Sequence, residues 1–139
     1  MKQLIFVSLI FLFISCSSDS DESQSNTANQ ITPPSWIQGT WSQRIGSPND
    51  YTYLPTFRFK PNDFCSLNSN IETCFGNSIQ QSNGGVTSSQ VINENEYKLT
   101  ITINSSQTTT YHFLKINDTK IEYVVEPSSV YDNLELFKE

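Results

Sequence analysis

The sequence has few of the residues that carry chemistry or bind nucleic acids. It contains one histidine, one methionine, three cysteines and only 8 lysines and arginines among 139 residues. The formal net charge is −6, and the basic residues are scattered along the chain rather than clustered. Nucleic-acid-binding proteins present basic patches, so we expect no nucleic-acid partner. The same acidity argues against docking of the folded part on anionic lipid.

Catalytic motifs are also missing. The sequence has no Gly-x-Ser-x-Gly, no His-Glu-x-x-His and no P-loop. The one histidine, His112, has no partner nucleophile in any motif, so we expect it at the surface or rim, facing outward beside Thr110. Glu94 and Glu96 flank a turn and are expected to form a solvated hairpin tip. We therefore expect no enzyme, no catalytic residues and no cofactor.

The cysteines do not suggest a metal centre. Eight residues separate Cys65 from Cys74, and no Cys-x-x-Cys is present. Two sulfurs and one distant imidazole do not make a zinc site, so we expect no metal. Once Cys16 near the N-terminus is set aside, two cysteines remain, and an even number in an exported chain suggests a disulfide. We expect Cys65 and Cys74 to be joined, with a metal or redox pair as the competing interpretation.

No apolar run is long enough to cross a membrane. The longest, residues 4–14, has only Ser8 as a polar residue. A spanning helix needs about 20 apolar residues, whereas a secretory signal core needs about 7 to 15 after a basic start. Lys2 supplies that start. We expect residues 1–15 to be a signal peptide.

The apolar run stops at a lone cysteine, and acids follow it. Ser15 and Cys16 precede Asp19, Asp21 and Glu22. This resembles the bacterial lipoprotein signal, in which the cysteine is lipidated and becomes the first residue. The acids resemble the surface-export signal of Bacteroidetes lipoproteins. The resemblance implies a lipid anchor on Cys16 in the outer membrane, at the cell surface or, alternatively, on the periplasmic side; several acyl chains anchor stably.

A polar segment separates the signal from the rest of the chain. Residues 17–35 are mainly serine, asparagine, aspartate and proline, and Ile31 is their one aliphatic residue. Such a segment cannot bury enough apolar surface to order itself. We expect residues 16–35 to be the lipidated cysteine with a disordered tether, and residues 36–139 to form one domain.

Alternation of apolar and polar residues runs through this domain. Tyr97, Leu99 and Ile101 alternate with polar residues, which indicates a strand with one buried face. Turns rich in asparagine, glycine and aspartate separate such segments. We predict an all-β fold, a small antiparallel up-and-down β-barrel of about eight strands. The expected strands are about 37–45, 53–60, 63–68, 74–81, 86–92, 96–104, 107–116, 119–126 and 133–138.

The first expected strand contains Gly39 and Trp41 in a Gly-x-Trp motif. This resembles the lipocalins and lipocalin-like domains, in which the tryptophan closes one end of the barrel and the glycine lets the backbone bend beneath it. Residues 57–64, "FRFKPNDF", and 114–123, "LKINDTKIEY", resemble lipocalin-like domains of Bacteroidetes lipoproteins. Larger lipocalins stack an arginine from near the last strand on the tryptophan; here Lys138 is the nearest substitute.

Aromatic residues are the remaining candidates for a binding site. A barrel of eight strands holds side chains only, or one small ligand. We expect a lipid-anchored cell-envelope binding protein that holds a small hydrophobic ligand. The alternative is that the same rings fill the core of a structural or protein-interaction lipoprotein, such as an envelope accessory, immunity or inhibitor protein. The expected pocket residues are Trp41, Tyr53, Phe57, Phe59, Tyr97, Phe113 and Tyr123.

Overall fold

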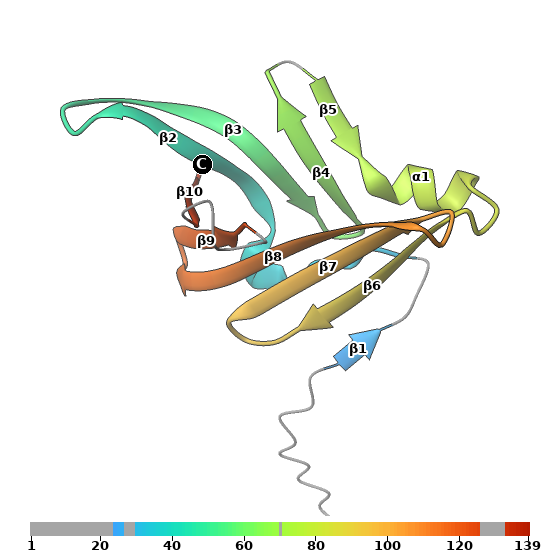
Figure 1. Ribbon diagram of the computed structural model, residues 1–139. Coiled ribbons are helices and arrows are strands. Elements are labelled where there is room, and N and C mark those ends of the chain that lie inside the picture. The colour runs from blue at the N-terminus through green and yellow to red at the C-terminus, as the bar shows by residue number, and fades with distance from the viewer. Residues whose placement is uncertain (1–23, 27–29, 70, 126–132) are drawn as a thin grey trace, which may run out of the picture.

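The computed structural model describes residues 24–26, 30–69, 71–125 and 133–139. Ten strands form one antiparallel sheet in the order β1-β6-β7-β8-β9-β10-β2-β3-β4-β5 (Figure 1). The expected signal peptide, Cys16 and the acids that follow it lie outside the described residues. The elements are β1 Gln24–Asn26, the 3-10 turn η1 Ser35–Ile37, β2 Gly39–Ser47, β3 Asp50–Lys60, β4 Asp63–Asn68, β5 Ile71–Cys74, α1 Phe75–Gln81, β6 Val86–Ile92, β7 Glu96–Ile103, β8 Gln107–Asn117, β9 Lys120–Val124 and β10 Leu134–Lys138.

Two up-and-down meanders make up the sheet apart from β1, which pairs with the outer side of β6. Strands β2 to β5 form one, strands β6 to β10 form the other, and the pairing of β10 with β2 joins them. The sheet curls, and α1 packs against both β4 and β6 (Figure 1). Within the described residues β5 does not pair with β6, so the curled sheet stays open there. The predicted all-β antiparallel fold is confirmed, and its shape is barrel-like with an opening beside α1.

The predicted strand over residues 74–81 is wrong, because residues 75–81 form helix α1. Phe75 and Ile79 are four residues apart, so a helix turns both side chains toward the core. The Asp63 carboxylate on β4 accepts a 2.7 Å hydrogen bond from the Gly76 N–H, which satisfies one amide of the first turn. A Cβ at Gly76 would lie only 2.8 Å from that carboxylate oxygen. Tertiary contact with β4 therefore decides the conformation of this segment.

The chain ahead of β2 packs on the domain. Ile31 is completely buried in the core, although residues 30–35 were expected to belong to the tether. The buried Gln90 side chain holds this segment: its Oε1 accepts the Thr32 N–H at 2.9 Å, and its Nε2 donates to the Gln30 carbonyl at 2.9 Å. The Tyr97 hydroxyl also donates to Gln90 Oε1. The Gln90 side-chain amide thus makes the two hydrogen bonds to residues 30–32 that the backbone of a neighbouring strand would otherwise make.

A β-bulge changes which residues of β3 face the core. Trp41 pairs with Phe57, but the next residue, Ser42, pairs with Pro55, so Thr56 is the extra residue. A shift of one residue exchanges the two faces of a strand. Phe57 therefore faces the core, whereas Tyr53 faces away from it.

We expect Ile31→Ala to destabilise the protein by about 2–5 kcal/mol, because a fully buried isoleucine leaves a cavity when it is truncated. Chemical denaturation measures the free energy of unfolding. Ile103→Ala is the matched control, since Ile103 is 40% exposed, and should change stability by less than about 0.5 kcal/mol. Equal effects of the two substitutions would show that the segment before β2 is not part of the core.

Candidate functional site

Most of the expected pocket residues form one packed cluster of rings. Trp41, Phe59, Tyr97 and Phe113 are at most 2% exposed, and Phe57 is 7% exposed. The Phe57 ring lies 5.4 Å from Phe113 and 5.2 Å from Tyr123, centroid to centroid, and Phe59 lies 5.0 Å from Phe113. These are contact distances for aromatic pairs. These rings therefore contact one another in the core.

Three further rings belong to this cluster and were not expected there. Phe64 on β4 lies 5.5 Å from Phe57, 4.8 Å from Tyr111 and 5.6 Å from Phe75 on α1. Burial raises the pKa of the Tyr111 hydroxyl, and the neighbouring Tyr123 raises it further. Burial also raises the pKa of the Tyr97 hydroxyl. Both tyrosines act as neutral core residues at physiological pH.

Tyr53 stands apart from the other expected pocket residues. Its side chain is 52% exposed, and its ring contacts Phe137 on β10 at 6.2 Å. The bulge at Thr56 is the physical reason, because it turns Tyr53 to the face opposite Phe57. The expectation that Tyr53 lines a pocket together with Phe57 and Phe59 is therefore wrong for Tyr53.

Gly39, Trp41 and Lys138 come together at one end of the sheet. The Trp41 indole N–H donates a 2.6 Å hydrogen bond to the Ile37 carbonyl, and the ring is fully buried. The Lys138 ammonium lies 5.5 Å from the centre of that ring. Gly39 has a φ of +128°, and a Cβ there would lie 3.0 Å from Lys138 Cε. The Lys138 side chain of β10 thus covers the Trp41 ring of β2.

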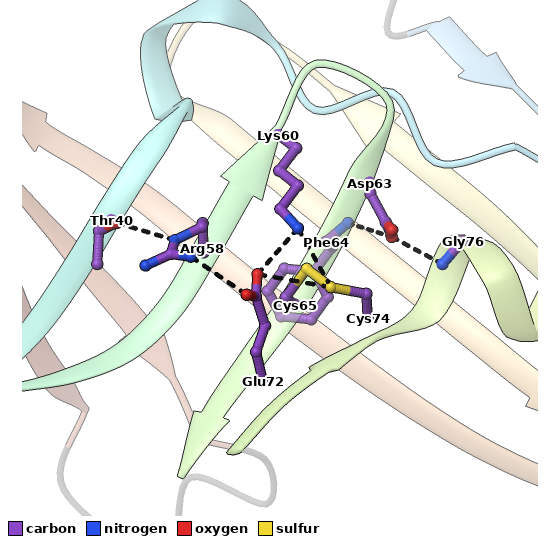
Figure 2. A network of polar contacts seen from close by, with 9 residues as sticks. All are labelled: Thr40, Arg58, Lys60, Asp63, Phe64, Cys65, Glu72, Cys74 and Gly76. Carbon is purple, nitrogen blue, oxygen red and sulfur yellow. Dashed lines mark hydrogen bonds and ion pairs between the residues drawn. A yellow bond between two sulfur atoms is a disulfide. The ribbon is translucent and has the colours of Figure 1, made fainter. Parts of the chain in front are cut away.

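A disulfide and an ion-pair network fix the edge of the sheet at β5 (Figure 2). Cys65 and Cys74 are directly opposite each other on β4 and β5 and are joined, which confirms the expected disulfide. Closing such a short loop stabilises by about 2–3 kcal/mol on the chain-entropy account. Beside it, Glu72 accepts from Lys60 Nζ at 2.9 Å and from Arg58 Nη1 at 3.2 Å. The hydrogen bond from Lys60 is the main reason that the pKa of Glu72 is lowered.

Asp63, Cys65 and Cys74 lie close enough together to resemble a metal site, with donor atoms within 4.8 Å of one another. The two sulfurs are bonded to each other. Asp63 Oδ1 accepts hydrogen bonds from the N–H groups of Phe64 and Gly76, at 2.8 and 2.7 Å (Figure 2). In this state all three side chains hold β4, β5 and α1 together.

His112 lies on the outer face of β8, as expected, but neighbouring side chains cover most of it. Its side chain is 15% exposed, and Nε2 lies 2.9 Å from Glu96 Oε1 on β7. The other oxygen of Glu96 accepts a 2.9 Å hydrogen bond from the Asn93 amide. Glu94 is exposed at the turn. The contacts of Glu96 therefore tie β7 to its neighbours.

The surface feature that sequence reasoning missed is a two-stranded arm, defined here as residues 44–47 of β2 and 50–55 of β3. Of the seven exposed large hydrophobic residues in the described chain, four lie on it: Ile45, Tyr51, Tyr53 and Leu54. The strand expected over 53–60 begins earlier, at Asp50, so β3 is 11 residues long against 6 in β4 and projects beyond it.

Comparison with protein-family models, with curated proteins and with solved structures gives no match. Among the described residues no helix has the length and apolar character needed to span a membrane. The residues themselves must therefore support any functional proposal.

We expect Glu72→Gln to reduce stability at pH 7 and to have less effect near pH 3. The pKa of Glu72 is lowered from its ordinary value of 4.5 on folding, so the charged carboxylate stabilises the folded state above that pH. This contribution disappears as the pH falls through the lower folded-state pKa. Urea denaturation of wild type and variant at both pH values measures the difference, with Glu94→Gln as the exposed control. A stability difference that grows on acidification would contradict this account.

Proposed function

We propose that this protein is a lipid-anchored cell-envelope protein that acts by binding another protein, with a lipocalin-like domain whose core is filled by its own side chains. The observation that carries the proposal is the ring cluster around Phe57. Phe64, Phe113 and Tyr123 all lie within 5.5 Å of it, centroid to centroid. A small-ligand site needs a concave apolar space, and contacting rings leave none between them.

The chemistry of the described residues also supports a binding role. Glu96 and His112 are engaged with each other, and Glu72 is engaged with Lys60 and Arg58. These carboxylates have partners that stabilise the fold rather than a nucleophile to activate. Exposed tyrosines on the arm are residues that protein interfaces favour.

The anchor follows from the resemblance of residues 1–22 to a lipoprotein signal. Lipidation of Cys16 would fix the chain to the outer membrane, and Asp19, Asp21 and Glu22 favour display at the cell surface. Residues 17–23 then connect the anchor to β1, which pairs with β6. The domain is thereby held near the membrane while its surface remains free to meet a partner.

The alternative is a carrier of a small hydrophobic ligand. It requires the rings of Phe57, Phe113 and Tyr123 to separate, which would lose both their mutual contacts and their burial. Each buried aromatic side chain is worth about 1.5–3 kcal/mol. A ligand would have to replace these contacts with its own, so a filled core favours the protein-binding function.

Native mass spectrometry of the full chain, purified from bacterial envelopes in detergent, tests the proposal. We expect the mass of the lipidated chain from Cys16 onward, with no further adduct. Cys16→Ser is the control and should lack the lipid mass. A discrete additional mass that disappears on denaturation would contradict the protein-binding function and identify a carrier. Wild-type protein without lipid would contradict the anchor.

A further inference from the structure

The arm leaves the rest of the sheet on both sides. Strand β10 pairs with β2 only over Trp41–Gln43, and β4 pairs with β3 only over Phe57–Lys60. Beyond these points the arm strands pair only with each other among the described residues. Figure 1 shows the hairpin extending past the neighbouring strands. Its side chains are therefore open to contact from outside the domain.

One face of the arm carries an arginine and three rings. Arg44 is paired with Tyr53, and Gly46 with Tyr51, so these side chains share a face. Phe137 of β10 is opposite Ser42, two residues before Arg44, and so lies on the same face. We call Arg44, Tyr51, Tyr53 and Phe137 the arm patch. It lies on the side of the sheet opposite the ring cluster.

Arg44 is held between two of these rings. Its guanidinium carbon lies 4.2 Å from the centre of the Tyr51 ring and 4.5 Å from that of Phe137. Stacking fixes the plane of a guanidinium and leaves its N–H groups directed sideways, where they match a carboxylate in a bidentate pair. The rings thus preorganise the side chain for an anion.

The charge of Arg44 is not neutralised within the described chain. Arg58, Lys60, Lys115 and Lys120 each form an ion pair with a carboxylate, whereas Arg44 forms none among the described residues. The protein as a whole is acidic, with a net charge of −6. Lys98 and Lys138 also form no ion pair in the described part of the chain, but Arg44 is the one that two rings preorganise, so it is a point of attraction for negative charge.

The surroundings of Arg44 favour a carboxylate on a protein over the phosphates of a lipid surface. Tyr51 and Tyr53, 37% and 52% exposed, offer apolar and hydrogen-bonding contact beside the charge. Tyrosine and arginine together are the residues that dominate protein-binding hot spots.

We propose that the arm patch binds an acidic segment of a partner protein, with one carboxylate held by the Arg44 guanidinium and apolar side chains packed on Tyr51 and Tyr53. This inference rests on the proposed protein-binding function and adds the place and the chemistry of the contact.

Two labelled pentapeptides test the inference, Val-Glu-Leu-Glu-Val and its lysine counterpart Val-Lys-Leu-Lys-Val, with the full chain in detergent and fluorescence anisotropy as the readout. We expect the wild type to bind the acidic peptide at least tenfold more tightly. Arg44→Glu should reverse this preference, because it reverses the charge at the contact. Lys98→Glu, a charge reversal on β7 away from the arm, should leave the preference unchanged. An unaltered preference in Arg44→Glu would overturn the inference.

The aromatic contribution has its own readout. Tyr53→Ala should weaken binding of the acidic peptide about tenfold, and Tyr53→Phe should retain most of it. In nuclear magnetic resonance spectra the Arg44 Nε–H signal should shift when the acidic peptide is added. A shift confined to residues away from the arm patch would place the contact elsewhere and overturn the inference.

Two further outcomes separate this inference from the function on which it rests. If neither peptide binds while native mass spectrometry finds no carried ligand, the arm patch is wrong and the protein-binding function stands. If a carried ligand is found, the protein-binding function fails whatever the peptides do. A concentration-dependent dimer in sedimentation that Arg44→Glu abolishes would assign the patch to a second copy and overturn the peptide partner.

Discussion

The contact between the ring-bearing faces of the two meanders is the constraint on which the rest of the structure depends. Phe57, on the first meander, meets Phe113 and Tyr123, on the second, at 5.4 and 5.2 Å. In the part of the chain that the structure describes, the meanders are joined side by side only through β10 and β2, so these rings meet only if the sheet curls. Aromatic pairs contribute about 0.5–1.5 kcal/mol beyond their burial, and many such pairs share this core. Burial of the rings therefore sets the curvature.

The same constraint explains what happens at the margins of the sheet. Among the described residues β5 does not pair with β6, and α1 packs against β4 and β6 beside this opening. The Cys65–Cys74 disulfide secures the edge strand β5, which has a neighbour on one side only. The long β2 and β3 continue beyond the rings and form the arm. Its apolar side chains extend beyond the core and are exposed at the surface.

Sequence alternation predicts those parts of the fold in which local pattern and tertiary packing agree. The strands over 63–68 and 86–92 have the predicted bounds, and Tyr97, Leu99 and Ile101 share a buried face as expected. The side of Tyr53 was not predictable, because the bulge at Thr56 depends on the register against β2. Helix α1 depends on the Asp63 carboxylate of β4. Burial of Ile31 depends on Gln90, which comes 59 positions later in the 139-residue sequence.

In the candidate site, too, local sequence pattern predicts some features and tertiary contacts decide the others. The Gly-x-Trp motif drew attention to Gly39 and Trp41, and in the structure Lys138 of β10 lies against both. The aromatic residues were found from their positions on strands, but their number alone could not distinguish a lined pocket from a filled core. That distinction depends on distances between rings that are far apart in the sequence, such as Phe59 and Phe113.

Crystallography under xenon pressure tests the filled core most directly, because xenon enters apolar cavities that water does not occupy. The account predicts no xenon atom among Phe57, Phe64 and Phe113, whose rings contact one another. An ordered xenon atom between these rings would reveal a cavity and contradict the claim that the protein's own side chains fill its interior.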